Sequence, residues 1–134
     1  MRVIILLLLS FGVQADWSFE NPRIIRNYDG DTFTAEFEIW RGHFVVTSVR
    51  VVGVDTPEIA TAKCNYEREL GVKAKRYVAE QLKKNVTVYV LDKNESRGRA
   101  LGVVYIDGSP LHKMLINKGL GRENHGQKRG GWCE

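Results

Sequence analysis

Residues 32–39 alternate between polar and apolar side chains, and this short period constrains the possible fold more than any other feature of the chain. A threonine or a glutamate separates each apolar residue from the next, and the apolar residues are Phe33, Ala35, Phe37 and Ile39. A period of two predicts a strand with one buried face. A turn at Arg41-Gly42 and a second apolar run at 44–54 follow, so the two runs predict a β-hairpin.

The hydrophobic period lengthens between residues 64 and 84, which predicts a helix in this segment. Its apolar side chains fall on one helical face, and they are Leu70, Ala74, Tyr77, Val78 and Leu82. Basic and acidic side chains occupy the other face. The helix is expected to begin somewhere between Asn65 and Gly71.

A second helix is expected near the C-terminus. It follows the turn dipeptide Asp107-Gly108. Ser109 is the predicted N-cap and Pro110 the first helical residue, because serine and proline favour these two positions. Gly119 is the predicted end of the helix. The tail at 121–134 is polar and glycine-rich and shows no period.

Three further strands are predicted, at 23–28, 86–91 and 100–106. The expected order is therefore three strands, a helix, two strands and a helix. This order predicts an α+β domain with a five-stranded OB-fold β-barrel and two or three helices. OB-folds often bind oligonucleotides, but a fold by itself does not establish a function.

The first fifteen residues are expected to be a secretory signal peptide, with the folded domain at 16–134. A basic start at Met1-Arg2 precedes an apolar run at 3–13, and small residues flank Gln14. A membrane span needs about 20 apolar residues, and this run is shorter. We therefore expect export to the periplasm or the medium, with no stable membrane association after cleavage.

The chain has two cysteines, Cys64 and Cys133. An even number of cysteines in an exported protein favours a disulfide, with two free thiols as the alternative. Neither cysteine belongs to a CxxC or CxxH pair, so the cysteines do not indicate a metal site.

Three groups of charged residues are of interest together although each is ordinary alone. They are Asp29-Gly30-Asp31-Thr32, then Arg50 with Asp55-Thr56-Pro57-Glu58, then Arg97-Gly98-Arg99. Two aspartates and a backbone carbonyl form part of a hard-oxygen site of the kind that Ca²⁺ prefers. A glutamate can orient or deprotonate water, and arginines can stabilise charge on a phosphate. The net charge of +4 is compatible with an anionic polymer as partner.

In this order and spacing, the three groups resemble the staphylococcal nuclease, or thermonuclease, family. The likeness extends from about residue 24 to residue 120, and Arg50-x4-Asp55-Thr56-Pro57-Glu58 is its most specific part. The resemblance implies an endonuclease that hydrolyses phosphodiester bonds of DNA and RNA with little sequence preference and leaves 3′-phosphate ends. It also implies a monomer that favours single-stranded or unpaired regions.

The resemblance assigns a role to each charged residue. Asp31 and Asp55 would bind Ca²⁺, with the carbonyl of Thr56 as a third ligand. Glu58 would act on the attacking water as general base or as its positioner. Arg50 and Arg99 would bind the scissile phosphate and stabilise the transition state.

Two positions depart from the family pattern. Ser96-Arg97 stands where the family often has Lys-Tyr, and Glu123-Asn124-His125 follows the second helix where a further tyrosine is common. Arg97 is a candidate substrate contact by its charge. The alternatives are a non-catalytic OB-fold module that binds single-stranded nucleic acid, and an exported structural domain whose charges form surface ion pairs. The complete acidic and arginine set favours catalysis.

A geometric condition follows for Arg50 and Asp55. They are an odd number of residues apart, so an ideal strand would point their side chains to opposite faces. They can meet only if the strand bends between them. Gly53 is the expected place for the bend, because glycine adopts backbone conformations that other residues avoid.

Overall fold

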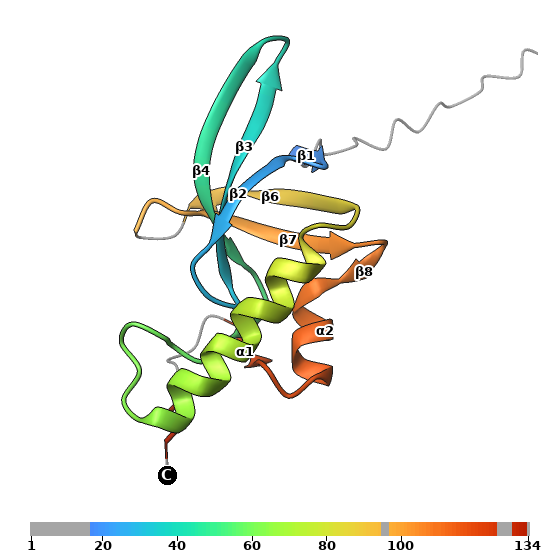
Figure 1. The fold of residues 1–134 in the computed structure, drawn as a ribbon. Helices are drawn as coiled ribbons and strands as arrows, with labels where there is room; N and C mark the ends of the chain where they lie inside the picture. Colours follow the sequence, from blue (N-terminus) through green and yellow to red (C-terminus); the bar gives the residue numbers. More distant parts are fainter. Residues whose placement is uncertain (1–16, 95–96, 126–129, 134) are drawn as a thin grey trace, which may run out of the picture.

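The computed structural model describes residues 17–94, 97–125 and 130–133, which form a curled sheet flanked by two helices (Figure 1). The larger strands are β2 (Arg23–Asn27), β3 (Thr32–Trp40), β4 (His43–Val51), β6 (Val86–Asn94) and β7 (Ala100–Ile106). The shorter ones are β1 (Trp17–Glu20), β5 (Val54–Asp55), β8 (Ser109–Pro110) and β9 (Arg122–Glu123). The helices are α1 (Asn65–Gln81) and α2 (Leu111–Asn117).

The large sheet has the strand order β1-β6-β7-β4-β3-β2, and β8 pairs with the side of β7. The β4–β7 pair is parallel and the other pairs are antiparallel. A separate pair joins β5 to β9. The predicted α+β class is confirmed, and the five predicted strands correspond to the five larger ones. The predicted strand count was too low, because β1, β5, β8 and β9 are additional short strands.

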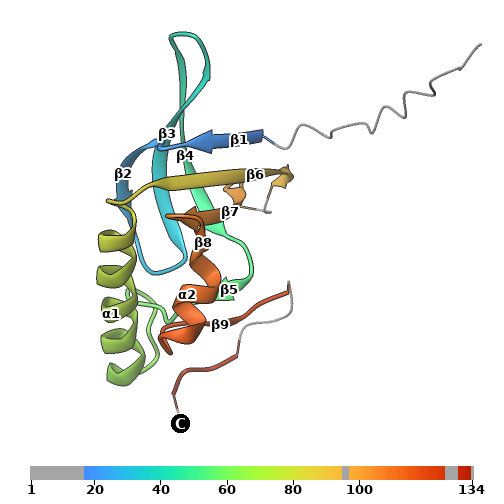
Figure 2. The ribbon, with the colours of Figure 1, turned by 90° about the vertical axis from the view of Figure 1, so that its right-hand side faces the viewer.

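The core lies between the concave side of the sheet and the helices. Its largest fully buried side chains include Phe33, Val49, Val88, Val104 and Leu111. Full burial of a valine, leucine or phenylalanine side chain contributes about 1.5–3 kcal/mol relative to exposure. Figure 2 shows α1 and α2 on the same side of the sheet, below the hairpin of β3 and β4. The core therefore fixes one end of this hairpin.

The other end of the hairpin extends away from the body of the molecule (Figures 1 and 2). The alternation predicted that Ile39 would be buried with Phe33, Ala35 and Phe37, but its side chain is 47% exposed. Trp40 at the tip is 74% exposed. The prediction for Ile39 was wrong because the sheet continues beyond the layer that the helices cover.

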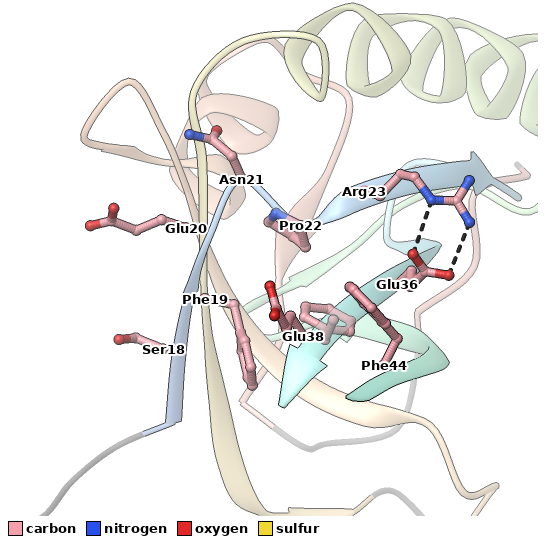
Figure 3. Close-up of a pocket in the computed structure, with 10 residues that line it drawn as sticks. Ser18, Phe19, Glu20, Asn21, Pro22, Arg23, Glu36, Glu38 and Phe44 are labelled. Atoms are coloured by element: carbon pink, nitrogen blue, oxygen red, sulfur yellow. Dashed lines mark hydrogen bonds and ion pairs between the residues drawn. The ribbon is translucent and has the colours of Figure 1, made fainter. Parts of the chain in front are cut away.

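A hollow of about 510 Å³ lies between β1 and this hairpin (Figure 3). Arg23 on β2 and Glu36 on β3 form a two-pronged ion pair at one side of it, with N–O distances of 3.2 and 3.0 Å. Phe19 packs edge-on against Phe37, with ring centroids 5.0 Å apart. None of the residues that line this hollow belongs to the three charged groups of the sequence.

Helix α1 begins within the predicted range, at Asn65. Cys64 is its N-cap, and the Cys64 Sγ accepts a hydrogen bond from the backbone N–H of Glu67 at 3.4 Å. Ala74, Val78 and Leu82 are buried as predicted. Glu67 is buried as well, and its carboxylate accepts a hydrogen bond from the backbone N–H of Lys63.

The predicted start of the second helix was wrong by one residue. Ser109 and Pro110 form strand β8 opposite Tyr105 and Ile106 on β7, and α2 begins at Leu111. Pro110 occupies the N-cap position and makes no side-chain cap hydrogen bond. Ser109 pairs with β7 through its backbone and is therefore not the N-cap that the sequence indicated. Gly119 follows the helix with φ of +71°, as expected for a helix-ending glycine.

The expected bend at Gly53 is present. Strand β4 ends at Val51, Gly53 has φ of +93°, and the chain resumes as the short strand β5. The carbonyl of Gly53 accepts a hydrogen bond from the backbone N–H of Asn124 at 3.2 Å. The bend therefore redirects the chain into the small β5–β9 pair.

Cys64 and Cys133 form a disulfide, as predicted, with their Cα atoms 6.1 Å apart. The bond ties the C-terminal tail to the start of α1. The predicted signal peptide at 1–15 lies outside the described residues. Among the residues that the structure describes, neither helix has the length and apolar character needed to cross a membrane.

Candidate active site

The site is built around the guanidinium group of Arg50. Its Nη2 lies 2.6 Å from Asp55 Oδ1, and its Nη1 lies 3.5 Å from Asp31 Oδ2. Asp31 stands at the start of β3, Arg50 near the end of β4, and Asp55 on β5. Both aspartates are buried, with exposures of 2% and 7%. The structure therefore brings together three residues that lie up to 24 positions apart in the chain.

Backbone and hydroxyl donors fix the Asp31 carboxylate. Its Oδ2 accepts a hydrogen bond from the backbone N–H of Thr56 at 3.0 Å, and its Oδ1 accepts one from Thr32 Oγ1 at 3.0 Å. The Asp31 carbonyl also accepts a hydrogen bond from the backbone N–H of Val51. These bonds place the three residues predicted to bind a metal ion, Asp31, Asp55 and Thr56, in one buried cluster.

The turn before β3 adds a third carboxylate. Asp29 Oδ1 accepts hydrogen bonds from the backbone N–H groups of Asp31 and Thr32, at 3.1 and 3.0 Å. Burial, and then the neighbouring charge of Asp31, raises the pKa of Asp29 to about 6. A carboxyl group with this pKa is mostly ionised at neutral pH, so the turn adds negative charge beside Asp31.

Gly30 allows this turn to pack closely. A Cβ atom at this position would lie 2.7 Å from Thr56 Cγ2 and 2.9 Å from the Cβ of Ala74 on α1. Any larger residue would force the turn away from Thr56. The glycine that looked like an ordinary turn residue in the sequence is therefore required for the approach of Asp31 to Thr56.

Arg50 points at the carboxylates that were expected to bind metal, and its contact with a substrate phosphate stays a prediction. Its Nη1 also donates to the carbonyls of Val51 and Val54, both at 2.8 Å. Within the described part of the chain, its Nε–H and the second Nη2 hydrogen make no hydrogen bond. A further acceptor such as a phosphate oxygen could use these two donors.

Glu58 follows the cluster by two residues and is half-buried. Its Oε2 accepts a hydrogen bond from Thr61 Oγ1 at 3.3 Å. Helix α1 packs directly against its backbone at Gly71, because a Cβ there would lie 2.8 Å from the Glu58 carbonyl oxygen and 2.9 Å from that of Pro57. The contact of Gly71 with the backbone of Pro57 and Glu58 therefore sets the position of Glu58.

Arg99 joins the cluster through Thr32. Its Nη1 donates to Thr32 Oγ1 at 3.1 Å, and the same hydroxyl donates to Asp31. Arg97 is exposed and lies in a cleft of about 410 Å³ that Glu58 also lines. The structure therefore places Arg99 beside the acidic pair and Arg97 beside Glu58.

Asn124 is a site residue that sequence reasoning missed. Its Nδ2 donates to Asp55 Oδ2, and the backbone of the same segment pairs with β5. The resemblance led us to expect a tyrosine near this position, so Asn124 counted only as a departure. Its position depends on the β5–β9 pair, which no hydrophobic pattern in the tail predicts.

The donor chemistry fits Ca²⁺, which prefers carboxylate and carbonyl oxygens. Asp31 and Asp55 supply two buried carboxylates, and one guanidinium only partly neutralises them. Across residues 17–94, 97–125 and 130–133, no cluster of three or more His, Cys, Asp or Glu side chains is arranged to bind a metal. The expected set has only two such side chains and takes its third ligand from the backbone, so it is not a cluster of this kind.

Comparison with known protein families gives a match to this chain. The family described as staphylococcal nuclease homologue matches residues 48–130. The chain belongs to this family. The matched segment contains Arg50, Asp55, Thr56, Glu58 and Arg99, so the family supports a nuclease-like function at the level of the domain. Asp31 lies before the matched segment.

An uncharacterized protein of Methanocaldococcus jannaschii is 30% identical to this chain over 116 residues. The match covers 71% of this chain and 51% of the relative. The chain thus spans about half the length of the relative. Because that protein is uncharacterized, the match adds no information on substrate or cofactor.

Proposed function

We propose that this protein is an exported, calcium-dependent endonuclease that hydrolyses phosphodiester bonds of DNA and RNA. The expected products carry 3′-phosphate ends, and sequence preference is expected to be low. We further propose that the working form is a monomer that favours single-stranded or unpaired regions.

One observation carries the proposal. The two aspartates, Arg50, the backbone of Thr56 and, through Thr32, Arg99 converge on a single buried cluster, with Glu58 two residues further on. A plain turn or an exposed ion pair would not require this convergence. Surface ion pairs contribute at most about 1 kcal/mol, which is little reason to gather so many charged groups. A buried acidic cluster beside arginines suits the binding of a cation and a phosphate.

The chain's own residues account for the reaction in the following way. Glu58 orients the attacking water and accepts its proton as the water oxygen bonds to phosphorus. The bond from phosphorus to the 5′-oxygen breaks, so the phosphate remains on the 3′ side. Arg50 and Arg99 donate hydrogen bonds to phosphate oxygens whose negative charge grows in the transition state.

Asp31, Asp55 and the Thr56 carbonyl would hold Ca²⁺. When bound, the ion supplies Lewis-acid stabilisation of the phosphate. Arg50 donates to the Val54 carbonyl and to the Asp55 carboxylate and keeps two donors for a substrate phosphate. This suits a residue that links the metal site to the substrate.

The export proposal rests on the pattern of residues 1–15. Production of the whole chain in a bacterial host should give an exported protein whose mass corresponds to a start at Asp16. An exported product that still begins at Met1, or a product that stays inside the cell, would contradict it.

The activity is tested with single-stranded DNA and RNA in Ca²⁺, followed by analysis of the product ends. We expect cleavage of both polymers and 3′-phosphate termini. Products with 3′-hydroxyl ends would contradict the proposed bond cleavage. Tight binding without cleavage would support the alternative, a non-catalytic OB-fold module that binds single-stranded nucleic acid.

A further inference from the structure

The cleft beside Glu58 has a wall that the proposed catalytic groups do not explain. The C-terminal tail forms this wall, and Trp132 belongs to it together with Gly130 and Gly131. Arg97 and Lys63 supply cationic groups to the same cleft. An aromatic ring, two cationic side chains, the proposed catalytic carboxylate and a second carboxylate, that of Glu67, thus surround one volume of about 410 Å³.

The position of Trp132 is fixed from two directions. Cys133, the next residue, is bonded to Cys64 at the start of α1, only six positions after Glu58. Arg122 lies against the indole ring, with its guanidinium carbon 3.8 Å from the ring centroid, and its Nη1 donates to the Gly131 carbonyl at 2.6 Å. The tail is therefore held in place at the site.

Arg122 lies over one face of the Trp132 ring, and the ring also lines the cleft that contains Glu58. Arg122 is not among the residues that line this cleft, but it lines a neighbouring hollow to which Trp132 also contributes. A planar ring that is backed by an arginine and lines the same cleft as the Glu58 carboxylate suits the flat face of a nucleobase. In the family pattern, such a surface would come from the tyrosines that this chain lacks, one just before Gly98 and one after the second helix.

We propose that Trp132 is the platform on which a base next to the scissile phosphate stacks, and that the Cys64–Cys133 bond holds this platform at the active site. Arg97 would contact a flanking phosphate. The inference rests on the proposed nucleic-acid substrate and extends it by naming the base-binding residue. Trp132 is a substrate-binding residue in this account, and the disulfide is a positioning element.

The test compares binding of a thymidine hexanucleotide with binding of an abasic oligonucleotide of the same length. Trp132→Ala should weaken binding of the hexanucleotide by about tenfold, within the range known for base–aromatic stacking. Binding of the abasic oligonucleotide should change by less than about twofold, because phosphate contacts remain. Trp132→Phe should retain most of the affinity. Equal losses for both probes would overturn the proposal, since a merely structural role would affect both.

The tether is tested with Cys133→Ser, which breaks the bond and keeps Cys64 as the helix cap. This variant should weaken hexanucleotide binding as much as Trp132→Ala does, and the double variant should be no weaker than either single one. Additive losses would show that the bond does not act through Trp132 and would overturn this part.

A readout that does not depend on cleavage separates this proposal from the proposed activity. Trp17→Phe with Trp40→Phe leaves Trp132 as the one tryptophan, and its fluorescence should be quenched by the hexanucleotide but not by the abasic probe. Quenching without any hydrolysis would support the platform and contradict the nuclease. Normal calcium-dependent cleavage with unchanged affinity in Trp132→Ala would overturn the platform alone.

Discussion

At the scale of single residues, two glycines set the approach of the groups proposed to bind metal and to act on water. Gly30 lets the Asp29–Asp31 turn contact Thr56, and Gly71 lets α1 contact the backbone of Glu58. Both positions look like ordinary turn or helix residues in the sequence. Their importance comes from contacts between segments distant in the chain, which no local pattern encodes.

Gly71→Ala tests this role. An alanine in the middle of a helix normally raises stability by about 0.5–1 kcal/mol relative to glycine. Here the added Cβ would lie under 3 Å from two backbone oxygens, so Pro57 and Glu58 must shift. We expect kcat to fall by about tenfold or more while KM changes little, because a small misplacement of a catalytic group is costly. Unchanged kcat together with a higher melting temperature would contradict the packing argument.

The predictions for individual site residues depended on the resemblance and on one geometric condition. Asp31, Arg50, Asp55 and Thr56 meet as expected, because the chain bends at Gly53. The two backbone acceptors of Arg50 were not predicted: the Asp55 carboxylate and the carbonyls of Val51 and Val54 take three of its donors. Buried guanidinium groups need such acceptors, but a strand pattern does not say which ones are in reach.

At the scale of elements, the strands with clear alternation were predictable and the short ones were not. The apolar residues of β3 are buried as far as Phe37, although Thr32 and Thr34 are buried too, and β7 buries every second residue. The pairs β5–β9 and β7–β8 contain only two residues per strand, and backbone contacts in the folded molecule determine them. The position of Asn124 could not be predicted because it depends on one of these pairs.

His112 on α2 packs against the bend at Gly53, between β4 and β5. A Cβ on Gly53 would lie 3.0 Å from its ring, and its Nδ1 is buried without a hydrogen-bond partner in the described part of the chain. Burial, and then the charge of Lys113, lowers the pKa of His112 below its usual 6.5. The unfolded chain therefore takes up this proton first when the pH falls.

This lowered pKa predicts that His112 reduces the free energy of unfolding as the pH falls from about 6.5, and has no such effect above that pH. The raised pKa of Asp29 acts in the opposite direction below pH 6, so the whole-protein curve combines the two. Denaturant unfolding of the protein and of His112→Gln between pH 5 and 8 separates them. The difference in free energy of unfolding between the protein and His112→Gln should depend on pH only below about 6.5. A difference that is constant over this range would contradict the lowered pKa of His112.

At the scale of the whole molecule, the disulfide joins the tail to α1 across 69 residues of chain. The chain-entropy argument gives a loop of this length a stabilisation of about 4 kcal/mol through the unfolded state. Cys133→Ser should therefore lower the free energy of unfolding by up to about 4 kcal/mol, measured in denaturant. The melting midpoint of the reduced protein should match that of the variant. Equal stability of oxidised and reduced protein would contradict this account of the tail.

The central claim is that the cluster around Arg50, with Glu58, performs calcium-dependent phosphodiester hydrolysis. The most direct test is the initial rate of single-stranded DNA cleavage by the protein and by Glu58→Gln, in Ca²⁺ and in a calcium chelator. We predict that chelation abolishes cleavage and that Glu58→Gln lowers the rate by about 10²–10⁴-fold, the usual contribution of a general base, with little change in DNA affinity. Cleavage that persists in chelator, or an unchanged rate in Glu58→Gln, would contradict the claim.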